Sequence, residues 1–282
     1  MGCRRENRNE AIGALSAPRM IGALTALTVA VCLFAIAGTA EARLFYGVTN
    51  HHIHSANDNL AKRKAFMPGV GSHLGDVESD GKYLYVADYG SGAIVRIRIA
   101  DKQVNTAWLV TGDGPWGPDI HGDYLYWAAY DQGSINRVKI KGKNKGAVKR
   151  DIVTEVTNIY DVITNGKHLY WAAFPKSRIG RARIDGSRRR PGFMKAGGYA
   201  CGVTIAKKKL YWAECDNGRI ARSNLDGKKK RRNWFKTPGP QSLTSDGKKL
   251  YFSTWGSIGW VNLKNRNNKI RPMVNATWEL ST

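Results

Sequence analysis

The chain is short of acidic residues. It has 22 Asp and Glu residues against 45 Lys and Arg residues, a formal net charge of +23 over 282 residues. Such an excess favours a polyanionic partner, such as nucleic acid, anionic lipid or acidic polysaccharide, or it keeps the protein soluble. Charge alone does not choose among these partners, so the choice depends on the sequence pattern.

Two kinds of pattern are missing as well. Beyond residue 42 no stretch has helical periodicity, which argues against a helical fold. The sequence also has no nucleophile elbow, phosphate-binding loop or paired-acid motif. It therefore gives no positive evidence of nucleophilic catalysis.

One long apolar run is present, from Ile21 to Ala37, and four arginines precede it. Ala40 and Ala42 stand at the small-residue positions of a cleavage site. This layout predicts a signal peptide over residues 1–42 and a secreted, periplasmic or cell-surface location. The alternative is an uncleaved anchor, because the run approaches the roughly 18–20 residues that span a bilayer. No later segment is apolar for long enough to cross a membrane.

Export affects which partners the positive charge is expected to bind and whether the cysteines can form a disulfide. An exported protein rarely meets chromosomal DNA, so we expect no nucleic-acid partner and turn to cell-surface polyanions. Export also permits disulfides, and Cys201 and Cys215 are the two cysteines after residue 42. Regular strand pairing would place Cys201 opposite Trp212, about three residues away from Cys215. A disulfide between the two cysteines therefore requires the chain to bend. Both the bridged and the free state stay open.

A repeat organises the rest of the chain. Five copies share a Leu-Tyr pair, with tyrosines at 85, 126, 170, 211 and 251, and Phe45 takes this place in a weaker first copy. Successive copies are 40, 41, 44, 41 and 40 residues apart. Asp-Gly or Asn-Gly turns of the hairpin type and alternating strands recur within the copies. Four antiparallel strands in about 40 residues are typical of a β-propeller blade.

Ring closure follows from the length. The 240 residues after Ala42 correspond to six units of 40. The first copy begins at its second strand, and the final residues TWELST resemble an inner strand without a partner. We therefore predict an all-β, six-bladed β-propeller over residues 43–282, closed by a C-terminal strand that joins the first blade. We expect a monomer.

The repeats resemble the low-density-lipoprotein-receptor class B repeat, also called the YWTD repeat. The fifth copy carries the closest match: Tyr211, Trp212, Ile220, Arg222, Leu225, Asp226 and Gly227. The resemblance implies a six-bladed propeller and an extracellular binding module. The final Asp of the motif, which ties blades together in that family, occurs as Asp88 and conservatively as Glu214. The receptor's flanking modules are absent, so the resemblance is to a secreted microbial type.

A second, broader resemblance is to the virginiamycin B lyase family of secreted propeller enzymes. That family is expected to have seven blades, whereas six are counted here. Its catalytic residues therefore cannot be placed on this sequence, and we assign none.

One face of such a ring surrounds the channel mouth and holds the connections between blades. Aromatic residues just before successive inner strands gather there: His73, Trp116, Tyr160, Tyr199 and Trp278. Aromatic rings with polar tips suit a sugar or peptide ligand. The alternative is that these rings plug the channel or pack between blades.

Carboxylates begin three of the inner strands: Asp76, Asp161 and Glu279. We place them in the same ligand site, facing the channel. Oxygen ligands of this kind could hold Ca²⁺. Bonding to inner-strand amides or to trapped water is the commoner role, so no cofactor is predicted.

Three close histidines, His51, His52 and His54, form a weak zinc pattern without a fourth ligand. A solvated loop is the simpler interpretation. They enter the enzyme alternative, a secreted hydrolase or lyase that uses His51, His52 or His73 with channel carboxylates and a metal.

The opposite face collects basic residues, because the remaining turns emerge there. The predicted anion-binding residues are Lys207, Lys208, Lys209, Lys228, Lys229, Lys230, Arg231, Arg232, Arg188, Arg189, Arg190, Lys248 and Lys249. Exposed turns are commonly rich in lysine, which is the plainer explanation. The functional hypothesis is salt-sensitive attachment to an anionic cell-surface polymer or to lipid headgroups. We predict a secreted binding module for an extracellular protein, peptide or glycan.

Overall fold

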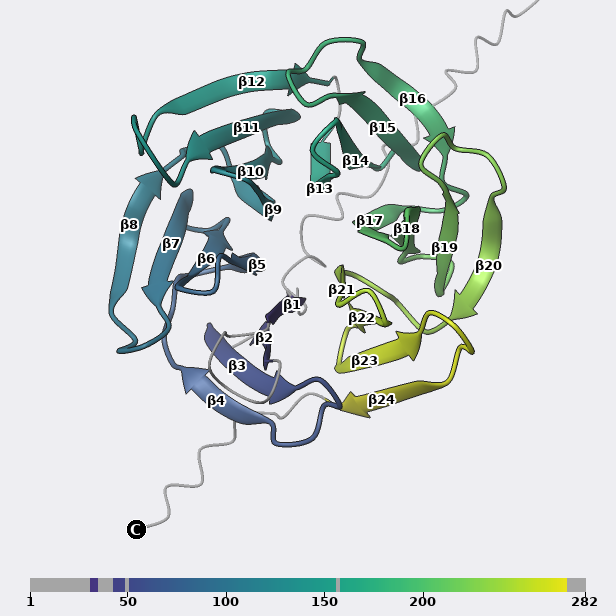
Figure 1. The fold of residues 1–282 in the computed structure, drawn as a ribbon, viewed down its shortest axis with the longest axis horizontal. Coiled ribbons are helices and arrows are strands. Elements are labelled where there is room, and N and C mark those ends of the chain that lie inside the picture. Colours follow the sequence, from purple (N-terminus) through teal and green to yellow (C-terminus); the bar gives the residue numbers. More distant parts are fainter. Residues whose placement is uncertain (1–30, 35–42, 49–50, 156–157, 273–282) are drawn as a thin grey trace, which may run out of the picture.

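The structure is a computed structural model that describes residues 31–34, 43–48, 51–155 and 158–272. Its strands form six four-stranded antiparallel sheets arranged in a ring (Figure 1). The first three sheets contain β1 (Val31–Phe34), β2 (Arg43–Val48), β3 (His52–Asn57) and β4 (Lys64–Met67); β5 (Leu74–Ser79), β6 (Tyr83–Asp88), β7 (Ala93–Arg98) and β8 (Val104–Val110); and β9 (Pro115–His121), β10 (Tyr124–Ala129), β11 (Ser134–Lys139) and β12 (Val148–Thr154).

In each sheet the first strand lies nearest the channel and the fourth strand lies outermost (Figure 1). The other three sheets contain β13 (Asn158–Thr164), β14 (His168–Phe174), β15 (Arg178–Arg183) and β16 (Arg190–Lys195); β17 (Ala200–Ala206), β18 (Lys209–Glu214), β19 (Arg219–Asn224) and β20 (Arg231–Lys236); and β21 (Leu243–Ser245), β22 (Lys249–Ser253), β23 (Ser257–Asn262) and β24 (Asn268–Pro272). The predicted six-bladed β-propeller is confirmed. The described chain contains no helix of the length and apolarity that a membrane crossing requires.

The strand that completes the first blade differs from the prediction. β1 pairs antiparallel with β2, with Val31 opposite Tyr46 and Phe34 opposite Arg43. This strand comes from the apolar run that the sequence predicts to be a signal peptide. The predicted closing strand within 277–282 lies outside the described residues. The physical requirement is unchanged, because the open edge of β2 needs an extended partner.

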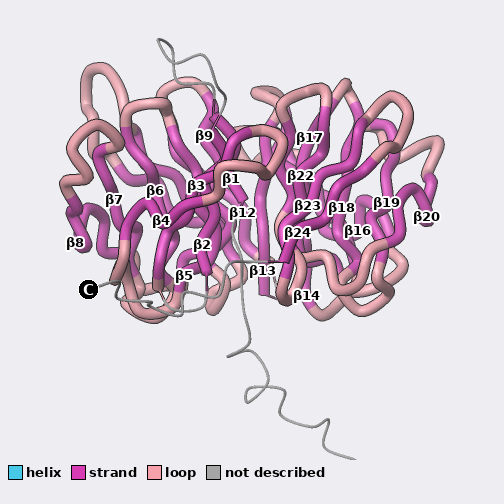
Figure 2. The backbone as a smooth tube through the Cα atoms, turned by 90° about the horizontal axis from the view of Figure 1, so that it is seen from below, coloured by secondary structure: helices cyan, strands magenta, loops and turns pink. Residues whose placement is uncertain are grey.

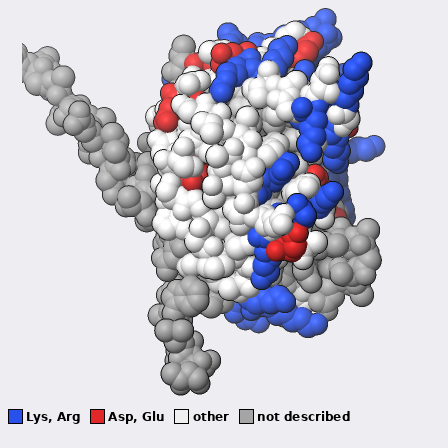
Figure 3. Space-filling view, turned by 90° about the vertical axis from the view of Figure 1, so that its left-hand side faces the viewer, with Lys and Arg blue, Asp and Glu red and all other residues white. Residues whose placement is uncertain are grey.

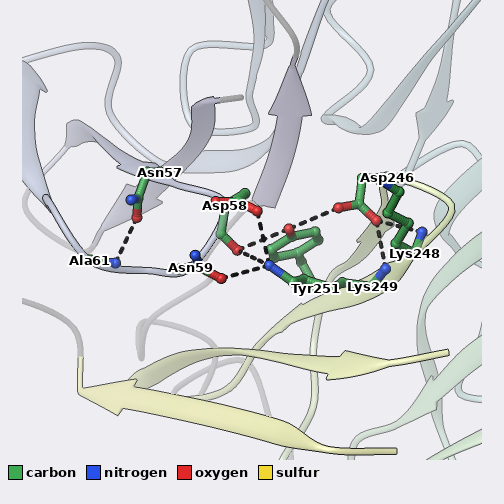
Figure 4. Close-up of polar contacts among 8 residues, drawn as sticks. All are labelled: Asn57, Asp58, Asn59, Ala61, Asp246, Lys248, Lys249 and Tyr251. Carbon is green, nitrogen blue, oxygen red and sulfur yellow. Dashed lines mark hydrogen bonds and ion pairs between the residues drawn. The ribbon is translucent and has the colours of Figure 1, made fainter. Parts of the chain in front are cut away.

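The first and sixth blades are joined at one end by a polar cluster (Figure 4). Lys249 Nζ forms an ion pair with Asp58 Oδ2 at 3.0 Å and donates to Asn59 Oδ1 at 2.8 Å. The Tyr251 hydroxyl lies 3.0 Å from the Asp58 carbonyl oxygen and 3.1 Å from Asp246 Oδ2. These contacts link the two blades that close the ring.

The aromatic residues of the repeat form the core between blades. Trp127, Trp171 and Trp212 are completely buried, and each lies on the second strand of its blade. Gly180 pairs with Trp171 across the sheet, and a Cβ at this glycine would lie 2.0 Å from the tryptophan ring. A glycine is therefore required where the large ring lies against the third strand.

The repeated arginine of the third strand packs on aromatic rings. Arg137 lies over the Tyr124 ring at 4.4 Å, and Arg181 lies over the Phe193 ring at 4.2 Å. Arg96 and Arg222 make the same kind of contact in their own blades. Cation–π contacts of this kind stabilise by about 0.5–2 kcal/mol each. Part of the positive charge therefore stabilises the blades.

Candidate functional site

The antiparallel order of each blade sorts its loops onto two ends of the ring (Figure 2). We call one end the mouth face; it holds the connections between blades and the loops between second and third strands. We call the other end the turn face; it holds the first-to-second and third-to-fourth turns. The candidate ligand site lies on the mouth face and in the channel beneath it.

Seven rings on the mouth face form a continuous aromatic arc across four blades. The aromatic arc consists of His73, Tyr89, Trp116, Tyr130, Tyr160, Phe174 and Tyr199. Contacting rings have centroids 5.1–6.2 Å apart, and most are tilted or edge-to-face. These separations are typical of favourable aromatic pairs. Trp278, the fifth predicted aromatic, lies outside the described residues.

The arc contains three rings that the sequence analysis missed. Tyr89, Tyr130 and Phe174 each lie four positions after the repeat tyrosine, where the second strand ends. A periodic search at this position would have found them. Cys215 takes the same place in the fifth blade, and Trp255, which is 46% exposed, takes it in the sixth.

The members of the arc differ in exposure. Trp116 and Tyr160 are buried at 3% and 6% exposure, whereas the other five rings are half-buried. The Tyr89 hydroxyl donates to Asp131 Oδ1 at 3.0 Å. Trp116 Nε1 has no hydrogen-bond partner among the described residues. The arc therefore presents apolar ring surface with a few polar groups at its edges.

Three buried carboxyls line the channel below the arc. Asp76 on β5, Asp119 on β9 and Asp161 on β13 surround a cavity of about 30 Å³, together with Pro118, Ser242 and the half-buried Glu78. Asp119 was missed by the sequence analysis, and Glu279 lies outside the described residues. The channel carboxyls therefore come from three consecutive blades.

Two of these carboxyls accept amides from the next blade. Asp161 Oδ2 accepts the Val203 N–H at 2.7 Å, and Asp119 Oδ2 accepts the Thr164 N–H at 2.9 Å. Both bonds satisfy donors on inner strands whose edges face the channel. The structural role named in the sequence analysis therefore applies to Asp161.

Asp76 lacks the equivalent bond. Its Oδ1 atom is buried without a hydrogen-bond partner among the described residues, while the Ser242 side chain bonds to the same carboxyl. Asp119 lies opposite the repeat tyrosine Tyr126, and Thr204 lies opposite the repeat tyrosine Tyr211, so these two residues are equivalent in their blades. The residues just before them, Pro118 and Val203, are therefore equivalent as well. Proline has no N–H to donate.

Burial shifts the titration of all three groups. It raises the pKa of Asp76 to about 6 and the pKa of Asp119 to about 7. Burial and then the neighbouring Asp76 carboxyl raise the pKa of Asp161. Burial disfavours the charged form because an ion is poorly solvated away from water.

Tyr160 connects the arc with these acids. Burial raises the pKa of its hydroxyl, and Tyr130, Asp76 and Asp161 raise it further in that order. The hydroxyl is therefore within electrostatic range of both acids. A β-bulge between Ile159 and Asp161 lets this segment serve both the arc and the channel.

His52 and His54 of the first blade are buried, and neither ring nitrogen of His54 has a hydrogen-bond partner among the described residues. His52 Nδ1 accepts the Gly69 N–H at 3.2 Å, and the His54 ring packs 5.6 Å from the Tyr46 ring. His73 belongs to the aromatic arc, and burial lowers its pKa. Across residues 31–34, 43–48, 51–155 and 158–272, no three His, Cys, Asp or Glu side chains are placed to hold one metal ion.

Asp88 and Glu214 have structural partners near the mouth. Asp88 Oδ1 accepts the His73 N–H at 2.8 Å, which ties the strand end to the loop before β5. Glu214 is completely buried, accepts Trp212 Nε1–H at 2.9 Å and pairs with Arg219 at 2.5 Å. Asp88 therefore holds a loop in place beside the arc, and Glu214 links β18 to β19.

Cys201 and Cys215 form a disulfide, with Cα atoms 6.0 Å apart. A β-bulge between Ala200 and Gly202 interrupts the register of β17 and β18. The bulge removes the three-residue offset expected from regular pairing. The Cys215 N–H also donates to the Tyr199 carbonyl at 3.0 Å, which places the bridge next to the arc.

Basic residues are sorted to the turn face. Its described loops contain 18 Lys and Arg residues, whereas Lys176 is the only one in the described loops of the mouth face. On the side drawn in Figure 3, Lys and Arg side chains are concentrated towards one end of the ring. Several turn aspartates, such as Asp80 and Asp226, accept backbone N–H groups of their own turns.

Not all predicted anion-binding residues extend freely from the turn face. Lys249 pairs with Asp58, and Lys209 Nζ bonds to Asn224 on the neighbouring strand. Arg189 bonds to the carbonyl of Thr154 at the mouth end of β12. Besides Arg189, the exposed members are Lys207, Lys208, Lys228, Lys229, Arg231, Arg232, Arg188, Arg190 and Lys248, and Lys230 is half-buried.

Comparison with known proteins supports the fold. No family model and no curated protein sequence matches the chain. A chain of the nidogen–laminin complex superposes with a TM-score of 0.64 at 19% identity, covering 87% of this chain and 94% of that one. Virginiamycin B lyase from Staphylococcus aureus gives 0.61 at 14%, covering 87% and 84%. A gluconolactonase from Xanthomonas campestris gives 0.66 at 15%, covering 81% and 84%.

At these identities the likeness shows the propeller fold alone. The nidogen neighbour agrees with the YWTD-like repeats, while membership of a secreted microbial type stays a prediction. The neighbours include both enzymes and a chain from a protein complex, so the function rests on the site.

Proposed function

We propose that the protein is a secreted binding module whose mouth face takes an extracellular carbohydrate or peptide. The aromatic arc carries this proposal. Its five half-buried rings offer apolar surface across four blades, Trp116 and Tyr160 are buried among them, and tyrosine hydroxyls supply hydrogen bonds at the edge. Rigid rings with polar tips bind sugars and peptide side chains at small entropic cost.

The turn face supplies a second part of the proposed function. Its exposed lysines and arginines would attach the ring to an anionic cell-surface polymer and leave the mouth face outward. The opposite placement of basic residues and aromatic arc supports this orientation. Electrostatic attachment of this kind weakens as salt screens the charges.

A binding array tests the proposal directly. Glycans, cell-wall polymers and short peptides would be presented to the full-length purified protein at low and high salt. We expect at least one uncharged sugar or peptide to bind with little dependence on salt, since ring contacts are not screened. Binding of polyanions alone, lost at high salt, would contradict a ligand site at the mouth.

A second candidate function is a propeller hydrolase or lyase. The observation that favours it is the group of buried channel carboxyls with raised pKa values, because such groups cluster at catalytic sites. A bound metal would need ligands beyond the described set, such as Glu279. Stoichiometric metal in the purified protein and EDTA-sensitive turnover would establish this candidate.

A further inference from the structure

The channel below the aromatic arc contains an unused hydrogen-bond acceptor. Asp76 is 8% exposed and lines the cavity of about 30 Å³, and its Oδ1 atom has no partner among the described residues. Asp161 and Asp119 accept amides from the next blade. At Asp76 the residue in that position is Pro118, which offers no N–H.

A group that enters this cavity must be a small hydrogen-bond donor. The cavity has room for about one or two water-sized groups. Burial and the Asp76 carboxyl raise the pKa of Asp161, and the cavity lining holds the carboxyls of Asp76, Asp119, Asp161 and Glu78 but no Lys or Arg among the described residues. A single ammonium group matches the cavity in size, in charge and in its capacity to donate.

The surroundings favour a positive charge on the ligand. The face of an aromatic ring attracts cations, and Tyr160 of the arc directly precedes Asp161, one of the cavity acids. Lys176, the single basic residue in the described mouth loops, lines a different pocket with Glu155 and Arg178. The chain therefore shows no cation of its own at the channel acids within its described part.

We propose that the mouth face recognises a primary ammonium group on a short stem, with the ammonium bonded to Asp76 and the stem against the aromatic arc. Two sources carry this chemistry: a lysine side chain of a peptide and an amino sugar. This inference rests on the proposed binding function and narrows it to amine-bearing ligands.

The experiment compares matched ligand pairs on the full-length protein by calorimetry at pH 7.5. N-acetyl-lysine methylamide is paired with N-acetyl-norleucine methylamide, and glucosamine is paired with glucose. We expect the amine to bind about tenfold tighter than its neutral partner in at least one pair. The pair that shows the preference identifies the source as peptide or amino sugar.

Two variants test whether Asp76 is responsible for the preference for amines. Asp76→Asn should reduce it to within about twofold, because the amide no longer supplies a charge. Asp226→Asn on the turn face is the control and should keep it, since this carboxyl lies at the other end of the ring and bonds within its own turn. Melting temperatures confirm that both variants are folded, and the ligand pairs on the unchanged protein test the inference without either variant.

Equal binding of amine and neutral partners would overturn the inference and leave the proposed function intact. A preference that survives Asp76→Asn would overturn it as well. If no sugar or peptide bound in the array, the proposed function itself would fail.

Discussion

Asp76 and Pro118 line the same channel cavity, and Pro118 occupies the position from which its counterpart Val203 donates an N–H to Asp161. A single imino acid thus leaves one of the channel carboxyls without its partner from the next blade. The pairing explains why one acid is structural and its counterpart is available to a ligand.

Replacing Pro118 with Ala should restore the missing donor. The new N–H would compete for Asp76, so we expect the preference for amines to fall at least about threefold. Stability should change by less than about 1 kcal/mol, because the gained bond is offset by the greater freedom of the unfolded chain. Calorimetry and urea unfolding measure the two effects.

Pro115→Ala in the same strand is the control for this change. Pro115 pairs with Ala129 at the start of β9 and is not among the residues that line the cavity. An equal loss of amine preference in both variants would show that the position of Pro118 is unimportant.

Asp119 should make stability depend on pH. Its pKa is about 7 in the folded protein and near 3.8 when exposed, so the folded state binds more protons between these values. Stability contributed by this group is therefore present below about pH 4 and is lost as pH rises towards 7. Asp119→Asn should be more stable than the parent by about 2–4 kcal/mol at pH 8 and about equal at pH 4.

Chemical unfolding of both proteins at the two pH values provides the measurement. The comparison with the variant removes the effect of the general positive charge, which both proteins share. A difference in stability that stays constant from pH 4 to pH 8 would contradict the raised pKa.

The disulfide should stabilise the fifth blade. It closes a loop with a sequence separation of 14, which corresponds to about 3 kcal/mol in the chain-entropy model. We expect the double variant Cys201→Ser, Cys215→Ser to lose about 2–3 kcal/mol in urea unfolding without reductant. The parent treated with reductant should approach the variant, and an unchanged midpoint would argue against the bridge.

Charge removal from the turn face should weaken attachment to anionic surfaces. A triple change of Lys207, Lys208 and Lys248 to Gln is expected to reduce sedimentation with anionic vesicles or wall polymer several-fold at low salt. The matched control changes three exposed lysines at the mouth end: Lys176, Lys195 and Lys236. Equal losses of binding in both triple variants, or binding that does not change with salt, would contradict attachment through the turn face.

The sequence predicts the blades well because their repeat is a physical requirement. A Tyr or Phe every 40 to 44 residues marks one buried position in each second strand, and all six of these positions are buried. The antiparallel order then sorts the loops without further information. The end of the ring on which most basic turns lie was predictable for the same reason.

The arrangement of side chains in the channel was harder to predict from the sequence. In the third blade Gly117 stands nine residues before the repeat tyrosine, where the second and fourth blades have Asp76 and Asp161, and the acid, Asp119, lies two residues later, opposite the tyrosine. The repeat pattern also does not predict which distant groups a long side chain contacts. Arg189 belongs to a basic run by sequence, yet its guanidinium bonds to Thr154 of the preceding blade.

Bulges and chain ends account for the other differences. The bulge at Cys201 moves this residue towards Cys215, and regular strand counting has no signal for it. The first blade is completed by Val31–Phe34, because any extended apolar segment in reach can pair with the free edge of β2.

The affinity of the mouth face for a ligand identified on the array is the most direct test of the central claim. It would be measured for the unchanged protein, for Tyr130→Ala within the aromatic arc, and for Tyr124→Ala on the same blade at the turn end. We predict that Tyr130→Ala weakens binding about tenfold or more and Tyr124→Ala less than about twofold, with both variants folded. Equal affinities in all three proteins would contradict a binding site at the aromatic arc.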